Sequence, residues 1–135
     1  LCLFEGTNIS VGRGTNLQFQ IYGSPFLNKE KNDFKFNPAK NSGSKYPKHE
    51  GKLCYGKNLS KSERLNRFNL EFIINAYADS SDKSEFFNNY FIKLAGVDEL
   101  KNQIISGYSQ KEIKDSWKKK LEKYKLMRKK YLIYK

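Results

Sequence analysis

The first half of the chain shows the short apolar patterns that are typical of strands. Residues 1–4 form an apolar run that predicts a short buried strand, and residues 17–22 alternate apolar with polar side chains, as a half-buried strand does. Residues 34–36 place two phenylalanines around a lysine shortly before a proline, which predicts a short edge strand. Residues 53–55 predict a further short strand, which ends at Gly56.

Apolar residues recur at helical spacing in the second half of the chain. Capping boxes, in which a glutamate stands three residues after a serine, predict helix starts at Ser60 and Ser109. Gly96 and Gly107 stand where helices end. The sequence therefore predicts four helices, at residues 60–77, 86–94, 98–105 and from residue 109 onward.

These patterns together predict an α+β fold. A small mixed or antiparallel sheet from the N-terminal half would be covered by three to four helices from the C-terminal half. The 135 residues fit a single domain, residues 1–135, with a long loop at residues 27–52 that is rich in Lys, Asn, Ser, Gly and Pro. A loop of this length in a compact domain is usually a binding element or a mobile one.

Two apolar clusters in the helical half have alternative interpretations. The first cluster has the composition of a stacking platform for bases or sugars. The spacing of its residues is that of one helix face, however, which favours a place in the hydrophobic core. It comprises Phe86, Phe87, Tyr90, Phe91 and Leu94. The second is a stripe from Ile113 to Tyr131 between many lysines, a pattern found in helices that bind membrane surfaces or calmodulin-like partners. Docking of this stripe on the domain is the simpler interpretation.

The charge of the chain is strongly positive and unevenly distributed. The net charge is +12, with +6 in residues 29–61 and +8 in residues 109–135. No known nucleic-acid-binding motif accompanies this charge, so a solvated lysine surface is favoured and no nucleic acid partner is expected. Such a surface could still attract polyanionic cell-wall material. No run approaches the roughly 18 apolar residues that a membrane helix needs, so no membrane span is expected.

Residues 5–15 form a loop built to present polar groups. Glu5 ends the first apolar run, and glycines with little side-chain bulk between them follow. Arg13 lies between Gly12 and Gly14, which leaves room for a carboxylate, a phosphate or a sugar ring. The alternative is a salt bridge between Glu5 and Arg13 that holds a tight surface loop. Neither a Rossmann fingerprint nor a P-loop is present.

Two cysteines and one histidine complete the candidate chemistry. The spacing of Cys2 and Cys54 is not a metal-ligand pattern, and His49 does not complete one, so no metal or cofactor is expected. The two cysteines form either a disulfide or two buried free thiols on neighbouring strands. His49 is either a substrate contact or proton shuttle, or a solvated loop residue.

Several segments resemble one known family. CLFEGTNISVGRGT at residues 2–15 and FQIYGSP at residues 19–25 resemble the signature of the YbbC/NamZ-like exo-β-N-acetylmuramidases, most of all their bacteroidetal branch. Further similar segments follow in the same order: KLCYG at 52–56, LAG at 94–96, SW at 116–117 and RKKYLIY at 128–134. The resemblance covers essentially the whole chain.

The resemblance implies a glycoside hydrolase that removes N-acetylmuramic acid from the non-reducing ends of peptidoglycan fragments, in the periplasm or outside the cell. Its partners would be peptidoglycan-derived sugars and a Rossmann-like N-terminal domain that precedes this signature in the family. Residues 1–135 would then be the C-terminal domain of a longer enzyme, or a truncated gene product, and would be inactive alone. A non-catalytic carbohydrate-binding module is the first alternative, and a basic nucleic-acid-binding domain is the second.

The same resemblance implies a role for each of the candidate site residues. Most glycosidases use two carboxyl groups, and in this family the principal catalytic glutamate belongs to the N-terminal domain, across the substrate cleft. Glu5 is the candidate acid in this chain, because the apolar residues before it would favour the protonated form of a general acid. Arg13 is the candidate partner of the lactyl carboxylate of muramic acid. Further sugar contacts are expected from Thr7, Asn8, Ser10, Thr15 and His49.

Overall fold

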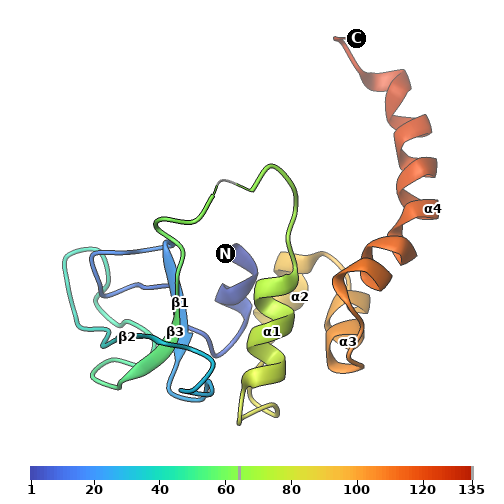
Figure 1. Cartoon of the computed structure of the whole chain (residues 1–135). Coiled ribbons are helices and arrows are strands. Elements are labelled where there is room, and N and C mark those ends of the chain that lie inside the picture. Colours follow the sequence, from blue (N-terminus) through green and yellow to red (C-terminus); the bar gives the residue numbers. More distant parts are fainter. Residues whose placement is uncertain (64, 135) are drawn as a thin grey trace.

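The computed structural model describes residues 1–63 and 65–134 and has the α+β composition that the sequence predicts (Figure 1). Its strands are β1 Ile21–Ser24, β2 Phe34–Phe36 and β3 Cys54–Asn58. The described residues hold four α-helices, namely α1 Glu71–Asp79, α2 Tyr90–Ala95, α3 Glu99–Ile105 and α4 Gln110–Arg128. Two 3-10 helices, η1 Cys2–Gly6 and η2 Lys129–Tyr131, lie near the two ends of the chain.

The sheet is antiparallel, with the strand order β1-β3-β2. Gly56 of β3 pairs with Gly23 of β1 and with Phe34 of β2, so it lies at the centre of the sheet. A Cβ atom on Gly56 would lie 1.8 Å from the carbonyl oxygen of Tyr22, so the close approach of these strands requires glycine. The predicted edge strand at residues 34–36 is confirmed.

The strand predicted at residues 17–22 is displaced along the chain. β1 begins only at Ile21, because Phe19 has a left-handed backbone with φ of 58° and its side chain is 44% exposed. The hydrogen bond from the Gln20 amide to the Leu17 carbonyl closes a turn here instead. The alternation of apolar and polar residues at positions 17–22 therefore predicted a longer strand than the one that forms.

The strand predicted at residues 1–4 is wrong, because η1 replaces it. The Phe4 amide bonds the Leu1 carbonyl at 2.9 Å, and the Thr7 amide bonds the Phe4 carbonyl at 3.0 Å, which is the spacing of a 3-10 helix. Gly6 lies against α2, where an added Cβ would be 2.4 Å from the Cα of Phe91. A short apolar run suits a buried strand or a buried helical turn equally, and packing against α2 selects the turn.

The helix predicted from Ser60 begins eleven residues later, at Glu71. The described residues among 60–70 are not helical, and the Ser60 amide bonds the side chain of Asn58 rather than a capping partner. Leu65 and Phe68 are 53% and 56% exposed, so they do not pack as a helical stripe would. This segment arches from β3 to α1 in Figure 1.

Only part of the apolar cluster at residues 86–94 fills the core, and not as one helix face, because Tyr90 is 52% exposed and Leu94 is not a core residue. α2 starts at Tyr90, so Phe86 and Phe87 precede it, and Phe87 forms an isolated β-bridge with Thr7. Phe86 and Phe91 are fully buried, and Phe87 packs edge-to-face on both of them. The remaining core comes from all parts of the chain: Phe4, Ile9, Val11, Tyr22, Leu27, Leu70, Ile73, Ala76, Leu100, Ile104 and Ile113.

The long helix α4 is confirmed, but its apolar stripe is docked only at its start. Ile113 is fully buried and Trp117 is partly buried, whereas Leu121 and Tyr124 are 47% and 53% exposed. Figure 1 shows α4 leading away from the rest of the chain, with the C-terminus at its far end. The predicted docking of the whole stripe is therefore wrong beyond Trp117. None of the described helices has the length and apolar character that crossing a membrane requires.

Candidate functional site

The opening loop, residues 5–15, is fixed to two distant parts of the chain. The Asn8 amide donates to the Phe86 carbonyl at 2.8 Å. Ser10 and Gly23 exchange two backbone hydrogen bonds of 2.8 and 2.9 Å, which join the loop to β1. The loop therefore has a defined shape that it does not form by itself.

Two glycines allow the loop to turn sharply around Arg13. Gly12 and Gly14 have φ values of 81° and 78°, in the left-handed region that side chains disfavour. A Cβ atom on Gly14 would lie 2.5 Å from the Ala39 carbonyl oxygen, and one on Gly12 would lie 2.6 Å from the Ile21 side chain. The turn leaves the guanidinium of Arg13 at the surface, as the sequence indicated.

Glu5 and Arg13 form an ion pair at the mouth of this loop. The Nε of Arg13 donates to Oε1 of Glu5 at 3.1 Å, and the two side chains are 47% and 31% exposed. The guanidinium also lies over the ring of Phe19, 5.1 Å from its centre. The bond uses one atom of each group, and a guanidinium carries five N–H donors, so Arg13 keeps donors for a second carboxylate.

Lys48 is a contributor to this site that the sequence analysis missed. Its half-buried Nζ donates to the carbonyl of Thr7 and, at 3.2 Å, to the carbonyl of Ile9. Burial lowers the pKa of Lys48, and the negative charge of Glu5 offsets part of this shift. Lys48 is thus a second cation, besides Arg13, that the charge of Glu5 influences.

His49 bonds the carbonyl of Asn8, the residue between Thr7 and Ile9. Its Nε2 lies 2.6 Å from the Asn8 carbonyl and 3.4 Å from Oγ of Ser24. A carbonyl oxygen only accepts, so Nε2 carries a hydrogen. Burial lowers the pKa of His49, the bond to Asn8 raises it, and the charge of Lys48 lowers it further. His49 is therefore not the freely solvated loop residue that one interpretation of the sequence described.

The side chains of Lys48 and His49 together hydrogen-bond three successive backbone carbonyls, those of Thr7, Asn8 and Ile9. His49 has a φ of 60°, an uncommon conformation for a residue with a side chain. Nothing in the composition of residues 27–52 distinguishes Lys48 from the other lysines of this loop. Only the folded chain shows that this loop shapes the opening one.

The other predicted sugar contacts lie in the same loop but bond within the chain. Thr7 and Ser10 are buried, and their hydroxyls bond the backbone of Phe4, Ile9 and Gly12. Thr15 donates to the Gly12 carbonyl at 2.7 Å. The side-chain amide of Asn8 is buried with no hydrogen-bond partner among the described residues. The role of these four residues as sugar contacts stays a prediction.

The two cysteines are free. Cys54 is buried in β3, and burial raises the pKa of its thiol to about 12, whereas Cys2 is exposed. The disulfide interpretation is therefore wrong, and the interpretation as free thiols holds with one of them at the surface. No cluster of three or more metal-ligating side chains occurs within residues 1–63 and 65–134.

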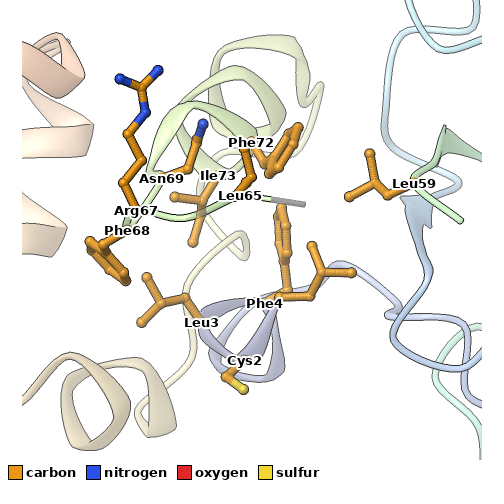
Figure 2. A pocket seen from close by; sticks show the side chains of 11 residues that line it. Cys2, Leu3, Phe4, Leu59, Leu65, Arg67, Phe68, Asn69, Phe72 and Ile73 are labelled. Carbon is orange, nitrogen blue, oxygen red and sulfur yellow. The ribbon is translucent and has the colours of Figure 1, made fainter. Parts of the chain in front are cut away.

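An apolar pocket of about 380 Å³ lies beside η1. Figure 2 shows side chains of η1, of α1 and of the segment before α1 converging on it. Leu3 and Phe4 come from η1, and Phe72 and Ile73 come from α1. The pocket offers little polar chemistry, so we assign it no part in sugar binding.

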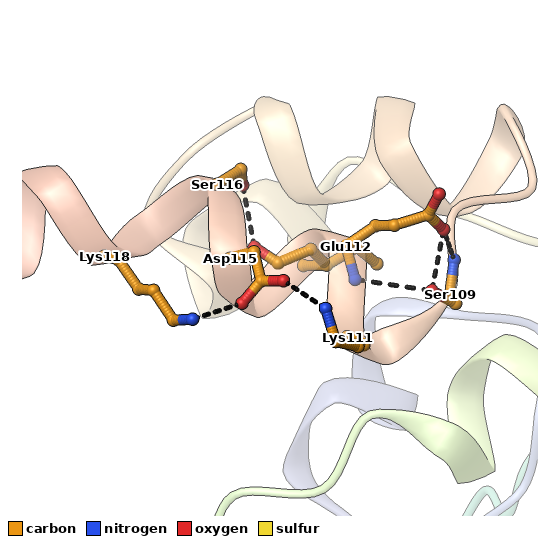
Figure 3. A network of polar contacts seen from close by, with 7 residues as sticks. Ser109, Lys111, Glu112, Asp115, Ser116 and Lys118 are labelled. Atoms are coloured by element: carbon orange, nitrogen blue, oxygen red, sulfur yellow. Dashed lines mark hydrogen bonds and ion pairs between the residues drawn. The ribbon is translucent and has the colours of Figure 1, made fainter.

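The first two turns of α4 carry a separate polar network (Figure 3). Ser109 and Glu112 form the predicted capping box, with the Glu112 amide 3.3 Å from the Ser109 hydroxyl. Asp115 pairs with Lys111 at 2.8 Å and with Lys118 at 2.6 Å, and these bonds lower the pKa of Asp115 to about 2. The network is exposed and stabilises the start of the helix.

Comparison with known proteins identifies relatives over the full length of the chain. Residues 1–134 match the family described as the C-terminal part of the exo-beta-N-acetylmuramidase NamZ. The peptidoglycan beta-N-acetylmuramidase NamZ of Bacillus subtilis (strain 168) is 33% identical over an alignment 146 residues long, gaps included, that covers 98% of this chain and 35% of that protein.

A solved structure supports the same relationship. The crystal structure of a DUF1343 family protein from Bacteroides fragilis NCTC 9343 superposes with a TM-score of 0.85 at 40% sequence identity. The match covers 99% of this chain and 38% of that one. The chain therefore spans between a third and two fifths of the length of these two relatives.

Proposed function

Since the chain belongs to the family of NamZ exo-β-N-acetylmuramidase C-terminal domains, we propose that it forms one wall of the substrate cleft of such an enzyme. The full-length protein would hydrolyse terminal N-acetylmuramic acid from peptidoglycan fragments, in the periplasm or outside the cell. The observation that carries the proposal is the position of Glu5 and Arg13, which meet at the exposed mouth of the loop with the family-like sequence.

Arg13 is the residue we propose for recognition of muramic acid. This sugar differs from N-acetylglucosamine by a lactyl group that carries a carboxylate. A guanidinium binds a carboxylate with two parallel hydrogen bonds, and Arg13 uses only its Nε in the bond to Glu5. The contact with the Phe19 ring, 5.1 Å from the guanidinium carbon, helps to hold the guanidinium in place.

Glu5 is the residue of this chain that we propose as a carboxyl group of the reaction. Glycoside hydrolysis needs an acid to protonate the leaving oxygen and a second carboxyl group as base or nucleophile. The second group would come from an N-terminal domain of the full-length protein across the cleft. Residues Lys48 and His49 would act as positioning residues, because they fix the carbonyls of the loop that follows Glu5.

The test uses the full-length enzyme and one substitution for each role. Glu5→Gln keeps a side chain that can bond Arg13, and we expect it to lower kcat by two orders of magnitude or more, on the order of the contribution of general acid catalysis. Arg13→Ala should raise KM for muramyl substrates and leave KM unchanged for an analogue without the lactyl group. Near-normal turnover of Glu5→Gln, or equal effects of Arg13→Ala on both substrates, would contradict these roles.

A non-catalytic carbohydrate-binding role is the alternative, and one observation favours it. Glu5 is already bonded to Arg13, so it could serve to orient the guanidinium rather than to transfer a proton. In that case Glu5→Gln, which can still bond Arg13, would leave kcat of the full-length enzyme near normal, whereas Glu5→Ala would weaken binding of muramic acid to the 135-residue chain, followed by NMR titration. A DNA titration at low and high salt addresses the nucleic acid alternative, since a steep salt dependence would mark phosphate binding.

A further inference from the structure

One face of the molecule is apolar over a larger area than the core requires. The pocket of Figure 2 and a second pocket of about 600 Å³ share Cys2, Leu3 and Phe68 as lining residues, so they are adjacent. The second pocket continues from η1 across α2 and α3 to the exposed part of the α4 stripe. We call this combined surface the η1–α4 face; its further members include Leu65, Leu94, Val97, Trp117, Leu121 and Tyr124.

The side chains of the η1–α4 face are exposed although they are apolar. Phe68, Leu121 and Tyr124 are 56%, 47% and 53% exposed, and Val97 is 47% exposed. A polar border is present, where Lys120 pairs with Glu99 at 2.8 Å. Contiguous exposed apolar patches with a polar border are typical of protein–protein and interdomain contacts.

We propose that the η1–α4 face is the surface on which the remainder of the full-length polypeptide docks. The proposal rests on the chain's proposed place in a longer enzyme, and two observations select this occupant. The two relatives carry roughly two thirds of their length outside the matched part. Leu1 lines the first pocket, and the Cα atom of a residue joined to it would lie about 3.8 Å from the Cα of Leu1, so a preceding domain would be tethered beside this face.

The chemistry of the face also favours a protein domain over the anionic surfaces that the lysines of α4 could attract. The lysines at positions 118, 119 and 123 line neither pocket and Lys120 lies at the border with Glu99, while the lining of both pockets is mainly aliphatic and aromatic. An interdomain contact typically buries about 600–1,500 Å² and has an apolar centre. The occupant we infer is accordingly a domain with an apolar patch of its own.

Cys2 is a natural reporter of this contact. Its exposed thiol lines both pockets, and the other thiol of the chain, Cys54, is buried in the sheet. The experiment compares the rate at which N-ethylmaleimide modifies Cys2 in the 135-residue chain and in the full-length protein, followed by mass spectrometry of the Cys2 peptide. We expect modification to be slower in the full-length protein by on the order of tenfold or more, because only opening of the contact would expose the thiol.

Matched variants of α4 separate docking from other effects. Leu121→Asp places a charge on the η1–α4 face, and Leu126→Asp makes the same change at a position that is 66% exposed and lines neither pocket. In the full-length protein, Leu121→Asp should restore fast modification of Cys2, and Leu126→Asp should leave it slow. Both variants should keep the melting temperature of the 135-residue chain, since neither side chain is buried in it.

Two results would overturn the proposal. Equal modification rates in the two proteins would show that the remainder of the polypeptide does not cover Cys2. Protection that appears in the 135-residue chain as its concentration rises would assign the face to a second copy instead. Neither measurement involves a sugar, so failure here would leave the proposed roles of Glu5 and Arg13 standing, and their failure would leave the docking surface standing.

Discussion

Replacing Lys48 by methionine tests whether the 27–52 loop shapes the opening loop. The substitution keeps most of the aliphatic stem and removes the ammonium that bonds the carbonyls of Thr7 and Ile9. Thr7 and Ile9 are 1% and 0% exposed, so water does not easily replace the lost donor. The expected result is a less stable chain with a more mobile opening loop.

The size of the effect follows from two opposing terms. A buried carbonyl without a partner costs about 1–3 kcal/mol, and two carbonyls lose a shared donor. Against this, the variant no longer removes a lysine charge from water, a cost that already lowers the pKa of Lys48. We expect a net loss of about 2 kcal/mol in the free energy of unfolding, or about 6 °C in melting temperature for a chain of this size.

Thermal and urea denaturation followed by circular dichroism measure this loss. Lys45→Met is the matched control, because Lys45 belongs to the same loop and its side chain is exposed. Hydrogen exchange at the amides of the opening loop gives a second readout, which should accelerate in Lys48→Met alone. Identical unfolding midpoints for the two variants would refute the idea that Lys48 holds these carbonyls.

Three further predictions concern the pH response, the sheet and the long helix. Burial depresses the pKa of His49 below its ordinary 6.5, so the unfolded chain binds more protons and stability falls as the pH drops through 6.5. His49→Asn, which tolerates the left-handed backbone, should flatten this decline in melts between pH 7.5 and 5. Gly56→Ala should lower stability by about 3 kcal/mol or more in denaturant titrations, since the added Cβ would meet the Tyr22 carbonyl at 1.8 Å. Ser109→Ala should cost about 1 kcal/mol through loss of the capping box, measured by the same titrations, with Ser106→Ala as a control.

Local signals in the sequence predicted the elements that local interactions determine. The Ser109 capping box begins α4, and Gly96 ends α2 with a φ of 76°, because both act within a few residues. The Ser60 pattern satisfies the same rule and yet forms no helix. Leu70 and Ile73 are buried in the core at the start of α1, while Leu65 and Phe68 stay more than half exposed. Tertiary packing therefore decided between two equally good local signals.

The exposed polar loop of the candidate site could be predicted from the sequence, but the contacts that residues 27–52 make with it could not. The glycines around Arg13 and the acid at Glu5 marked an exposed polar loop, and the alternative of a salt bridge between them is the contact that forms. Lys48 carried no signal and His49 was a candidate by its residue type alone, because their contacts with residues 7–9 cross about forty positions of sequence. One sequence shows no such pairing, and only the fold supplies it.

The two proposals meet in η1. Its first residues, Cys2 and Leu3, lie in the η1–α4 face, and Glu5 lies one turn later beside Arg13. A 3-10 turn closed by hydrogen bonds and packed through Gly6 against α2 has little freedom to deform between these points. A domain that docks on Cys2 and Leu3 would therefore also fix the direction of Glu5. The position of the candidate acid in this chain would thus be set from both sides, by a domain docked on the face before it and by the carbonyls that Lys48 and His49 hold after it.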